Sequence, residues 1–190
     1  MELVSRSEQR KKIHPHKFTL WVAIASILMM FAGLTSAFIV KSNLVGWSDV
    51  KMPKMFWFST AVIIASSITV QMALRSFTQR NMAAYRGLIA TTVGLGILFM
   101  VLQWFGFLEL WNQGYHWKGS AGASQFLYII FGLHAIHVLG GVIVLVVMFM
   151  KAFFGKIKLY SSVPIEVAAT YWHFVDILWI YLLLFFIIIG

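Results

Sequence analysis

Five apolar segments alternate with short polar connections along this chain of 190 residues. Crossing the hydrocarbon core of a membrane takes about 20 apolar residues in a helix, because lipid offers the backbone no alternative hydrogen-bond partner. The pattern therefore predicts an all-α integral membrane bundle of five transmembrane helices. Residues 1–17 form a basic N-terminal segment and residues 18–190 one transmembrane domain, since no linker or shift in composition divides them. The predicted helices are Phe18–Val40, Met55–Leu74, Gly87–Trp111, Gln125–Met150 and Ile165–Ile189.

The Lys and Arg residues of the connections are shared unevenly between the two sides of the predicted bundle. Eleven lie in the N-terminal segment and in the second–third and fourth–fifth connections, against four on the opposite side. Cytoplasmic connections of membrane proteins carry an excess of Lys and Arg. The asymmetry predicts that the N-terminus is inside and the C-terminus outside.

The composition supports lipid as the solvent of this chain. Hydrophobic residues make up 61% and charged residues only 11%, whereas a soluble domain carries roughly 25% charged residues. The net charge of +9 falls between the apolar segments, where it meets anionic lipid headgroups, and no basic stripe interleaved with aromatics indicates nucleic acid as a partner. The absence of cysteine excludes disulfides, thiolate metal sites and cysteine nucleophiles.

Several polar side chains lie inside the predicted membrane segments, where ionisable groups are costly and are functional candidates by default. They occur as pairs three residues apart on the fourth and fifth helices, a spacing that places each pair roughly on one face. The candidates are Gln103 and Glu109 in the third helix, His134 and His137 in the fourth, and Glu166, His173 and Asp176 in the fifth.

Three interpretations of the His and Asp residues follow from their chemistry. They form an interhelical hydrogen-bond network, handle protons because histidine titrates near neutral pH, or bind a metal with three His and a carboxylate. The spacing favours the network, and no metal-binding HExxH motif is present. Depth along the antiparallel fourth and fifth helices predicts that Asp176, rather than His173, meets His137.

Two stretches of sequence resemble subunit III of haem–copper respiratory oxidases, the cytochrome c and quinol oxidases. Tyr171–Trp179 reads YWHFVDILW and is similar to that family's YWHFVDxxW motif, and Gly132–Gly140 resembles its GxHxxHVxxG segment. Ser59–Ala73 and the run from Gln103 to Glu109 are also similar to family segments, and Glu166 falls where the family has an acidic residue. The resemblance covers all five predicted helices in order.

The chain departs from the family pattern in three places. It resembles the shorter five-helix members, because the two additional N-terminal helices of seven-helix members have no counterpart. The first helix has Ile27 after Ser26, where the family has a glutamate, and Gly106 occupies the family's Q-x-x-E position. A proton-handling role tied to that first glutamate therefore does not carry over.

The resemblance implies a non-catalytic subunit of an oxygen reductase of aerobic respiration. It implies that haem and copper are held by partner subunits, that no cofactor or metal is held by this chain, and that phospholipid binds to it. The expected partners are the catalytic subunit I, subunit II and other respiratory subunits, in a bacterial inner membrane. The expected role is to support proton uptake and stability during turnover. A small proton- or ion-translocating transporter is the alternative function.

Overall fold

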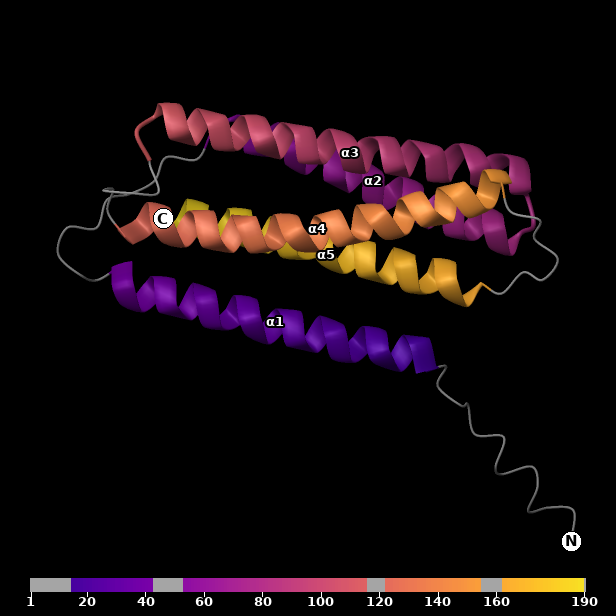
Figure 1. Ribbon diagram of the computed structural model, residues 1–190, viewed down its shortest axis with the longest axis horizontal. Helices are drawn as coiled ribbons and strands as arrows, with labels where there is room; N and C mark the ends of the chain where they lie inside the picture. The colour runs from indigo at the N-terminus through magenta and orange to yellow at the C-terminus, as the bar shows by residue number, and fades with distance from the viewer. Residues whose placement is uncertain (1–14, 43–52, 116–121, 155–161, 190) are drawn as a thin grey trace, which may run out of the picture.

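Five long helices make up the part of the chain that the computed structural model describes, namely residues 15–42, 53–115, 122–154 and 162–189. The helices run nearly parallel or antiparallel to one another (Figure 1). They are α1 (Pro15–Ser42), α2 (Met55–Thr78), α3 (Met82–Asn112), α4 (Gly122–Phe154) and α5 (Val163–Ile189). All five are long and apolar enough to cross a membrane, which confirms the predicted all-α bundle.

The helices extend beyond the apolar segments that predicted them. Hydropathy marks only the part immersed in hydrocarbon, whereas the helical backbone continues into the polar interface. The largest difference is between α2 and α3, where the expected connection Arg75–Arg86 shrinks to residues 79–81. Residues 1–14 of the basic N-terminal segment, together with Lys51, Lys118, Lys156 and Lys158, lie outside the described residues.

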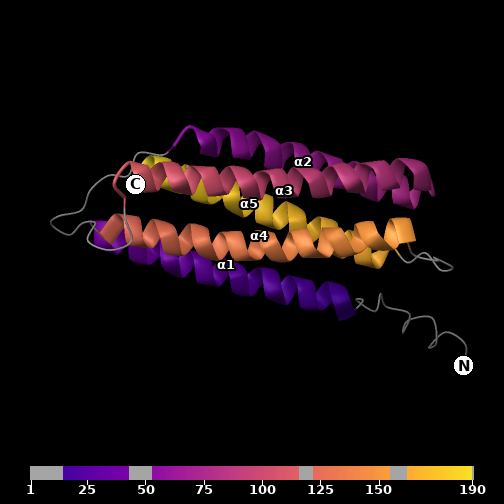
Figure 2. The ribbon, with the colours of Figure 1, turned by 45° about the horizontal axis from the view of Figure 1, so that its top comes forward.

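The tight connection between α2 and α3 depends on two residues. Arg80 adopts a positive φ of 59°, which reverses the chain direction directly after α2. The side chain of Asn81 then accepts a hydrogen bond from the backbone N–H of Ala84 at 3.2 Å and caps α3. Asparagine is among the preferred residues at this position because its side chain satisfies a free N–H of the first turn. The result is a closely packed antiparallel hairpin (Figure 2).

The last helix, α5, is the centre of the bundle. Half of its membrane-spanning stretch is buried inside the protein, against 22% of that of α1. Its backbone runs beside α1, α2 and α4, while α3 packs mainly on α2 and α4 and meets α5 through the large rings of the core. The outward faces of the other helices carry exposed large hydrophobic residues such as Met29, Trp104 and Phe154, as expected for surfaces that meet lipid.

Aromatic rings from four helices surround Trp179 and fill the half of the core nearer the C-terminal end of α5. Its ring lies edge-on to Phe56 of α2 and Phe99 of α3, with centroids 5.6 and 5.5 Å away, and 5.2 Å from the ring of Phe131 of α4. Edge-to-face pairs at such distances contribute about 0.5–1.5 kcal/mol each beyond the burial of their area. This cluster holds α2, α3 and α4 around α5.

A second tryptophan, Trp172, occupies the middle of the bundle and lies against two glycines. A Cβ atom added to Gly141 of α4 would come within 2.9 Å of its ring, and one added to Gly96 of α3 would come within 3.1 Å. A Cβ at Gly141 therefore has no room unless the indole ring shifts, and one at Gly96 would require the ring to move by a few tenths of an ångström. Gly132, also on α4, has open space where a Cβ would lie.

We expect Gly141→Ala to lower the free energy of unfolding by about 1–3 kcal/mol, because the added methyl overpacks the core against the indole ring. The matched control is Gly132→Ala, which should leave stability unchanged or raise it by up to about 1 kcal/mol through helix propensity. Denaturation of the two purified variants in detergent, followed by circular dichroism, measures the difference. Equal shifts in both variants would contradict the close fit of the indole ring against Gly141.

Candidate functional site

The polar side chains of α5 are directed mainly at α2. The imidazole Nδ1 of His173 lies 2.5 Å from the hydroxyl of Ser67, and its Nε2 lies 3.2 Å from Oε1 of Gln71. Because the Gln71 carbonyl oxygen can only accept, Nε2–H donates to it, and in the neutral imidazole Nδ1 accepts from the Ser67 hydroxyl. This group of three side chains, Ser67, His173 and Gln71, is called the polar triad below.

Two tryptophan N–H groups extend the same interface. Trp172 Nε1 donates to the hydroxyl of Ser66 at 3.1 Å, and Trp179 Nε1 donates to the hydroxyl of Thr60 at 3.0 Å. A buried indole N–H needs such a partner, since hydrocarbon cannot supply one. The α2–α5 interface is thus joined by hydrogen bonds along two to three helical turns.

This interface corrects the expected link between α4 and α5. Both oxygens of Asp176 and both ring nitrogens of His134 are buried and have no hydrogen-bond partner within the described residues, so Asp176 does not bond to His137. The rotation of α5 about its own axis explains why the expected link is absent, because the side of α5 that carries His173 and Asp176 faces α2. Asp176 lies close to the Ser67 hydroxyl, although the pair does not meet the geometry of a hydrogen bond.

The two histidines of α4 have different surroundings. His134 is 1% exposed and stacks on the ring of Trp179, with centroids 5.4 Å apart. His137 points Nδ1 at the carbonyl oxygen of Leu133 in its own helix, 2.7 Å away. Its backbone carbonyl accepts from the hydroxyl of Tyr171 at 3.0 Å. That bond joins α4 to α5 through the backbone rather than through imidazole.

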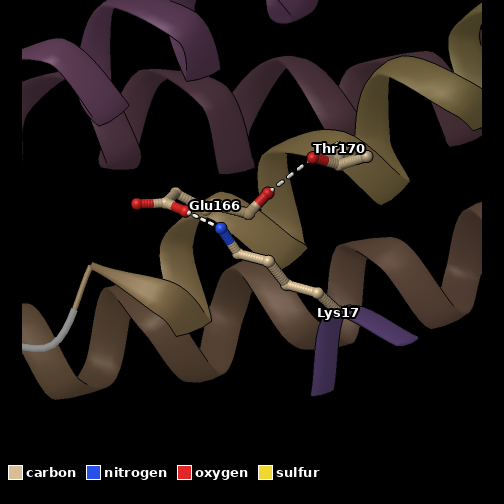
Figure 3. A network of polar contacts seen from close by, with 3 residues as sticks. All are labelled: Lys17, Glu166 and Thr170. Carbon is tan, nitrogen blue, oxygen red and sulfur yellow. Dashed lines mark hydrogen bonds and ion pairs between the residues drawn. The ribbon is translucent and has the colours of Figure 1, made fainter. Parts of the chain in front are cut away.

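Glu166 lies apart from the other candidates, at the end of the bundle where α5 begins. Its carboxylate is 2.6 Å from Nζ of Lys17 in α1, and both side chains are partly exposed. Figure 3 shows the pair, together with the hydrogen bond of 2.8 Å from the Thr170 hydroxyl to the Glu166 carbonyl. An ion pair this accessible contributes at most about 1 kcal/mol. It fixes the start of α1 against α5.

The remaining candidates lie on α3. The amide nitrogen of Gln103 donates to the hydroxyl of Ser59 on α2 at 3.2 Å, so Gln103 joins the two helices of the hairpin. Glu109 is half-buried toward the far end of α3. Among the described residues, no cluster of three or more His, Asp and Glu side chains is arranged to hold a metal ion.

Sequence reasoning missed the α2 half of the site. Thr60, Ser67 and Gln71 are spaced by seven and four residues, which places them on one face of a helix. A polar face on an otherwise apolar transmembrane helix was the available signal. Ser66 and Ser67 were not among the predicted site residues, because small residues in a transmembrane helix commonly serve close packing.

Comparison with known proteins decides the family. Residues 14–190 match the family model described as "Cytochrome c oxidase subunit III". The chain belongs to this family. It is 32% identical over 162 residues to a "Probable cytochrome c oxidase subunit 3" of Nocardia farcinica, covering 83% of this chain and 79% of that protein. It is 28% identical over 170 residues to the "Cytochrome c oxidase subunit 3" of Bacillus sp. strain PS3, covering 85% and 80%.

A third member differs in length. The chain is 31% identical over 136 residues to a "Probable cytochrome c oxidase subunit 3" of Rickettsia felis, and the match covers 70% of this chain but 48% of that protein. The Nocardia and Bacillus proteins are matched over four fifths of their length. This chain is therefore closer in size to them than to the longer Rickettsia protein.

The structure explains one departure from the subunit III pattern. At Gly106, a Cβ atom would collide with the ring of Phe56, so the phenyl group of α2 fills the space that a glutamate side chain would need. In α1, Ile27 follows Ser26 where the family pattern has a glutamate, and its side chain is half-buried and packs against the core. Apolar packing replaces both family carboxylates in this chain.

A double-mutant cycle tests the polar triad. We expect Ser67→Ala and His173→Leu to show a coupling energy of about 0.6 kcal/mol, and up to about 1.7 kcal/mol, because each variant removes the same hydrogen bond. The control pair is Ser67→Ala with His137→Leu, whose effects should add within about 0.5 kcal/mol. Denaturation in detergent gives both values. Coupling of Asp176 to His137 instead would restore the α4–α5 link.

Proposed function

We propose that this chain is a non-catalytic subunit of a haem–copper terminal oxidase in the aerobic respiratory chain. The observation that carries the proposal is the family match over residues 14–190, together with five continuous membrane-spanning helices. Membership of the subunit III family implies association with other oxidase subunits. The partners we propose are the catalytic subunit I and subunit II, in a bacterial inner membrane with the N-terminus inside.

The distribution of polar groups supports a structural rather than a redox role. The intramembrane histidine His173 bonds to neutral side chains of the same chain, and His134 is packed between aromatic rings. We assign haem, copper and electron transfer to the partner subunits. This chain then supports proton uptake and the stability of the complex during turnover.

The alternative, a small proton- or ion-translocating transporter, has less support. Transporters of that kind are commonly built from discontinuous helices whose broken ends bind the substrate at mid-membrane. Each of the five described helices runs without interruption. The hydrogen bonds of the polar triad also join α2 to α5 at one depth of the bundle rather than lining a path between its two ends.

Purification of the tagged chain from its own membranes tests the proposed function. The mild-detergent preparation should contain a haem-bearing catalytic subunit in fixed ratio and should reduce oxygen. The chain expressed alone should show neither a Soret band nor stoichiometric copper, since haem and copper are assigned to its partners. Recovery of the chain alone from native membranes, with ion transport in vesicles, would favour the transporter instead.

A groove at the inner ends of α1, α4 and α5 supports phospholipid binding. It has a volume of about 340 Å³. The groove is lined by the Lys151 side chain, by residues of the first turn of α5 and by apolar side chains of α4. A Lys side chain and the positive end of a helix dipole both favour an anionic phosphate group, while the walls suit an acyl chain. The lining residues are His16, Ile143, Val144, Val147, Met148, Lys151, Val163, Pro164 and Val167.

Lys151→Leu should reduce the anionic phospholipid that remains with the purified complex by at least half, because the headgroup loses its cation while the apolar walls stay intact. The control, Lys54→Leu, removes an exposed Lys at the opposite end of the bundle and should leave the lipid content unchanged. Quantitative mass spectrometry of extracted lipid provides the measurement. Equal lipid content in both variants would refute this lipid site.

A further inference from the structure

One face of the bundle is formed by the exposed side of α5, with α1 along one of its edges and α2 along the other. Exposed side chains recur along α5 at every third or fourth position, which defines a single stripe. Among the described helices, α1 contacts α4 and α5 but not α2, and Figure 1 shows α1 and the α2–α3 hairpin on opposite sides of α4 and α5. The stripe, called the α5 face below, consists of Ile177, Tyr181, Leu184 and Ile188.

The shape of this face suits a further helix. Packed helices have axes about 8–10 Å apart, so α1 and α2, each packed against a different flank of α5, leave space for another helix over the stripe between them. Lipid chains could fill the same space. The chemistry along its two edges decides between these occupants.

The edge formed by α2 carries the polar triad. His173 precedes Ile177 by four residues, so the two side chains are neighbours on the same side of α5. The triad side chains are only half-buried, and His173 lies roughly 15 Å from the start of α5, near the middle of the membrane. The amide nitrogen of Gln71 makes no hydrogen bond within the described part of the chain. A free amide donor is therefore available beside the α5 face at mid-membrane depth.

Lipid is a poor occupant for this edge. Acyl chains contain no hydrogen-bond acceptor, and the ester groups of phospholipids lie in the interface, far from mid-membrane. Polar and ionisable side chains inside a membrane almost always face protein or a water-filled cavity. Another polypeptide satisfies the Gln71 amide with a backbone carbonyl or a side-chain oxygen.

The edge formed by α1 is apolar and indented. A groove of about 390 Å³ lies between α1 and α5 and is bordered by Phe31, Phe174 and Tyr181 among others. Small residues follow this side of α1, where Ala25 and Ser36 are exposed in line with Ala32 of the groove. Small side chains allow a second helix to approach closely, and the groove receives its larger apolar side chains.

We propose that the α5 face is the docking surface for a transmembrane helix of another oxidase subunit. That helix places a hydrogen-bond acceptor opposite the Gln71 amide and apolar side chains in the groove beside Phe31 and Tyr181. The proposal rests on the proposed function, because it requires an oxidase partner. It adds which side of this chain the partner occupies and what chemistry recognises it.

Photochemical cross-linking in the intact oxidase tests this docking surface. A benzophenone side chain is introduced in place of Ile177 on the α5 face, or in place of Ile136 on the outward face of α4. The two isoleucines match closely, with 67% and 65% of their surfaces exposed, and both lie in the middle of their helices. A third variant at Ile68, on the exposed side of α2, probes the edge beside the triad.

After irradiation, the probes at positions 177 and 68 should form a protein adduct with the same oxidase subunit, at least tenfold more strongly than the probe at position 136. The cross-linked peptide should come from a predicted transmembrane helix with a polar residue near its middle. Recovery of haem with each tagged variant shows that the complex has assembled. If haem is recovered but position 177 forms only lipid adducts, or position 136 alone cross-links to protein, the docking surface is wrong while the proposed function stands.

Discussion

The fit of one indole ring between three helices is the constraint on which the bundle depends. Trp172 is fully buried at the centre of α5. Its ring lies against Gly96 of α3 and Gly141 of α4, and its N–H is bonded to Ser66 of α2. In a membrane, apolar burial gives little drive for helices to associate, so close packing and internal hydrogen bonds have to supply it. Trp172 provides both, because its large ring fills the space that two glycines leave and its one polar atom has a specific partner.

The same physical reasoning explains why α5 pairs with α2 through polar groups and with α4 through shape. The face of α2 toward α5 carries hydroxyl and amide groups, which satisfy the indole and imidazole nitrogens. The face of α4 offers glycine and a histidine ring that stacks on Trp179. The helix α2 therefore provides side-chain hydrogen-bond partners, whereas α4 provides close contact and a backbone acceptor, the His137 carbonyl. Asp176 remains buried without a hydrogen bond within the described residues, and the cost of such burial makes it the most demanding position in this interface.

The number and type of the helices could be predicted from the sequence because lipid permits a helix and little else in a hydrophobic run of this length. The rotation of each helix about its own axis, which decides the neighbour that each face meets, was harder to predict. The pair His173 and Asp176 indicated one polar face of α5, but which neighbour that face meets depends on the rotation of α5, which hydropathy does not define. The polar face of α2 contained the missing information, since Thr60, Ser67 and Gln71 share one side. The short turn at Arg80 and Asn81 was hidden for another reason, because charged residues at the membrane interface resemble a loop even when they are helical.

The connectivity of the bundle has a consequence for its biogenesis. The helices α2 and α3 are joined by three residues and are in extensive contact (Figure 2), so this hairpin can form as soon as both segments have left the ribosome. By contrast, α1 is synthesised before α2 and α3 but, among the described helices, contacts only α4 and α5, which are synthesised after them. Its inward-facing residues, including Phe31 and Thr35, therefore lack their final packing partners in the bilayer until α4 and α5 have been inserted. Insertion of α5, which follows the other four described helices in the chain, thus closes the bundle, and a nascent chain that stops before α5 leaves α1 without one of its two neighbours.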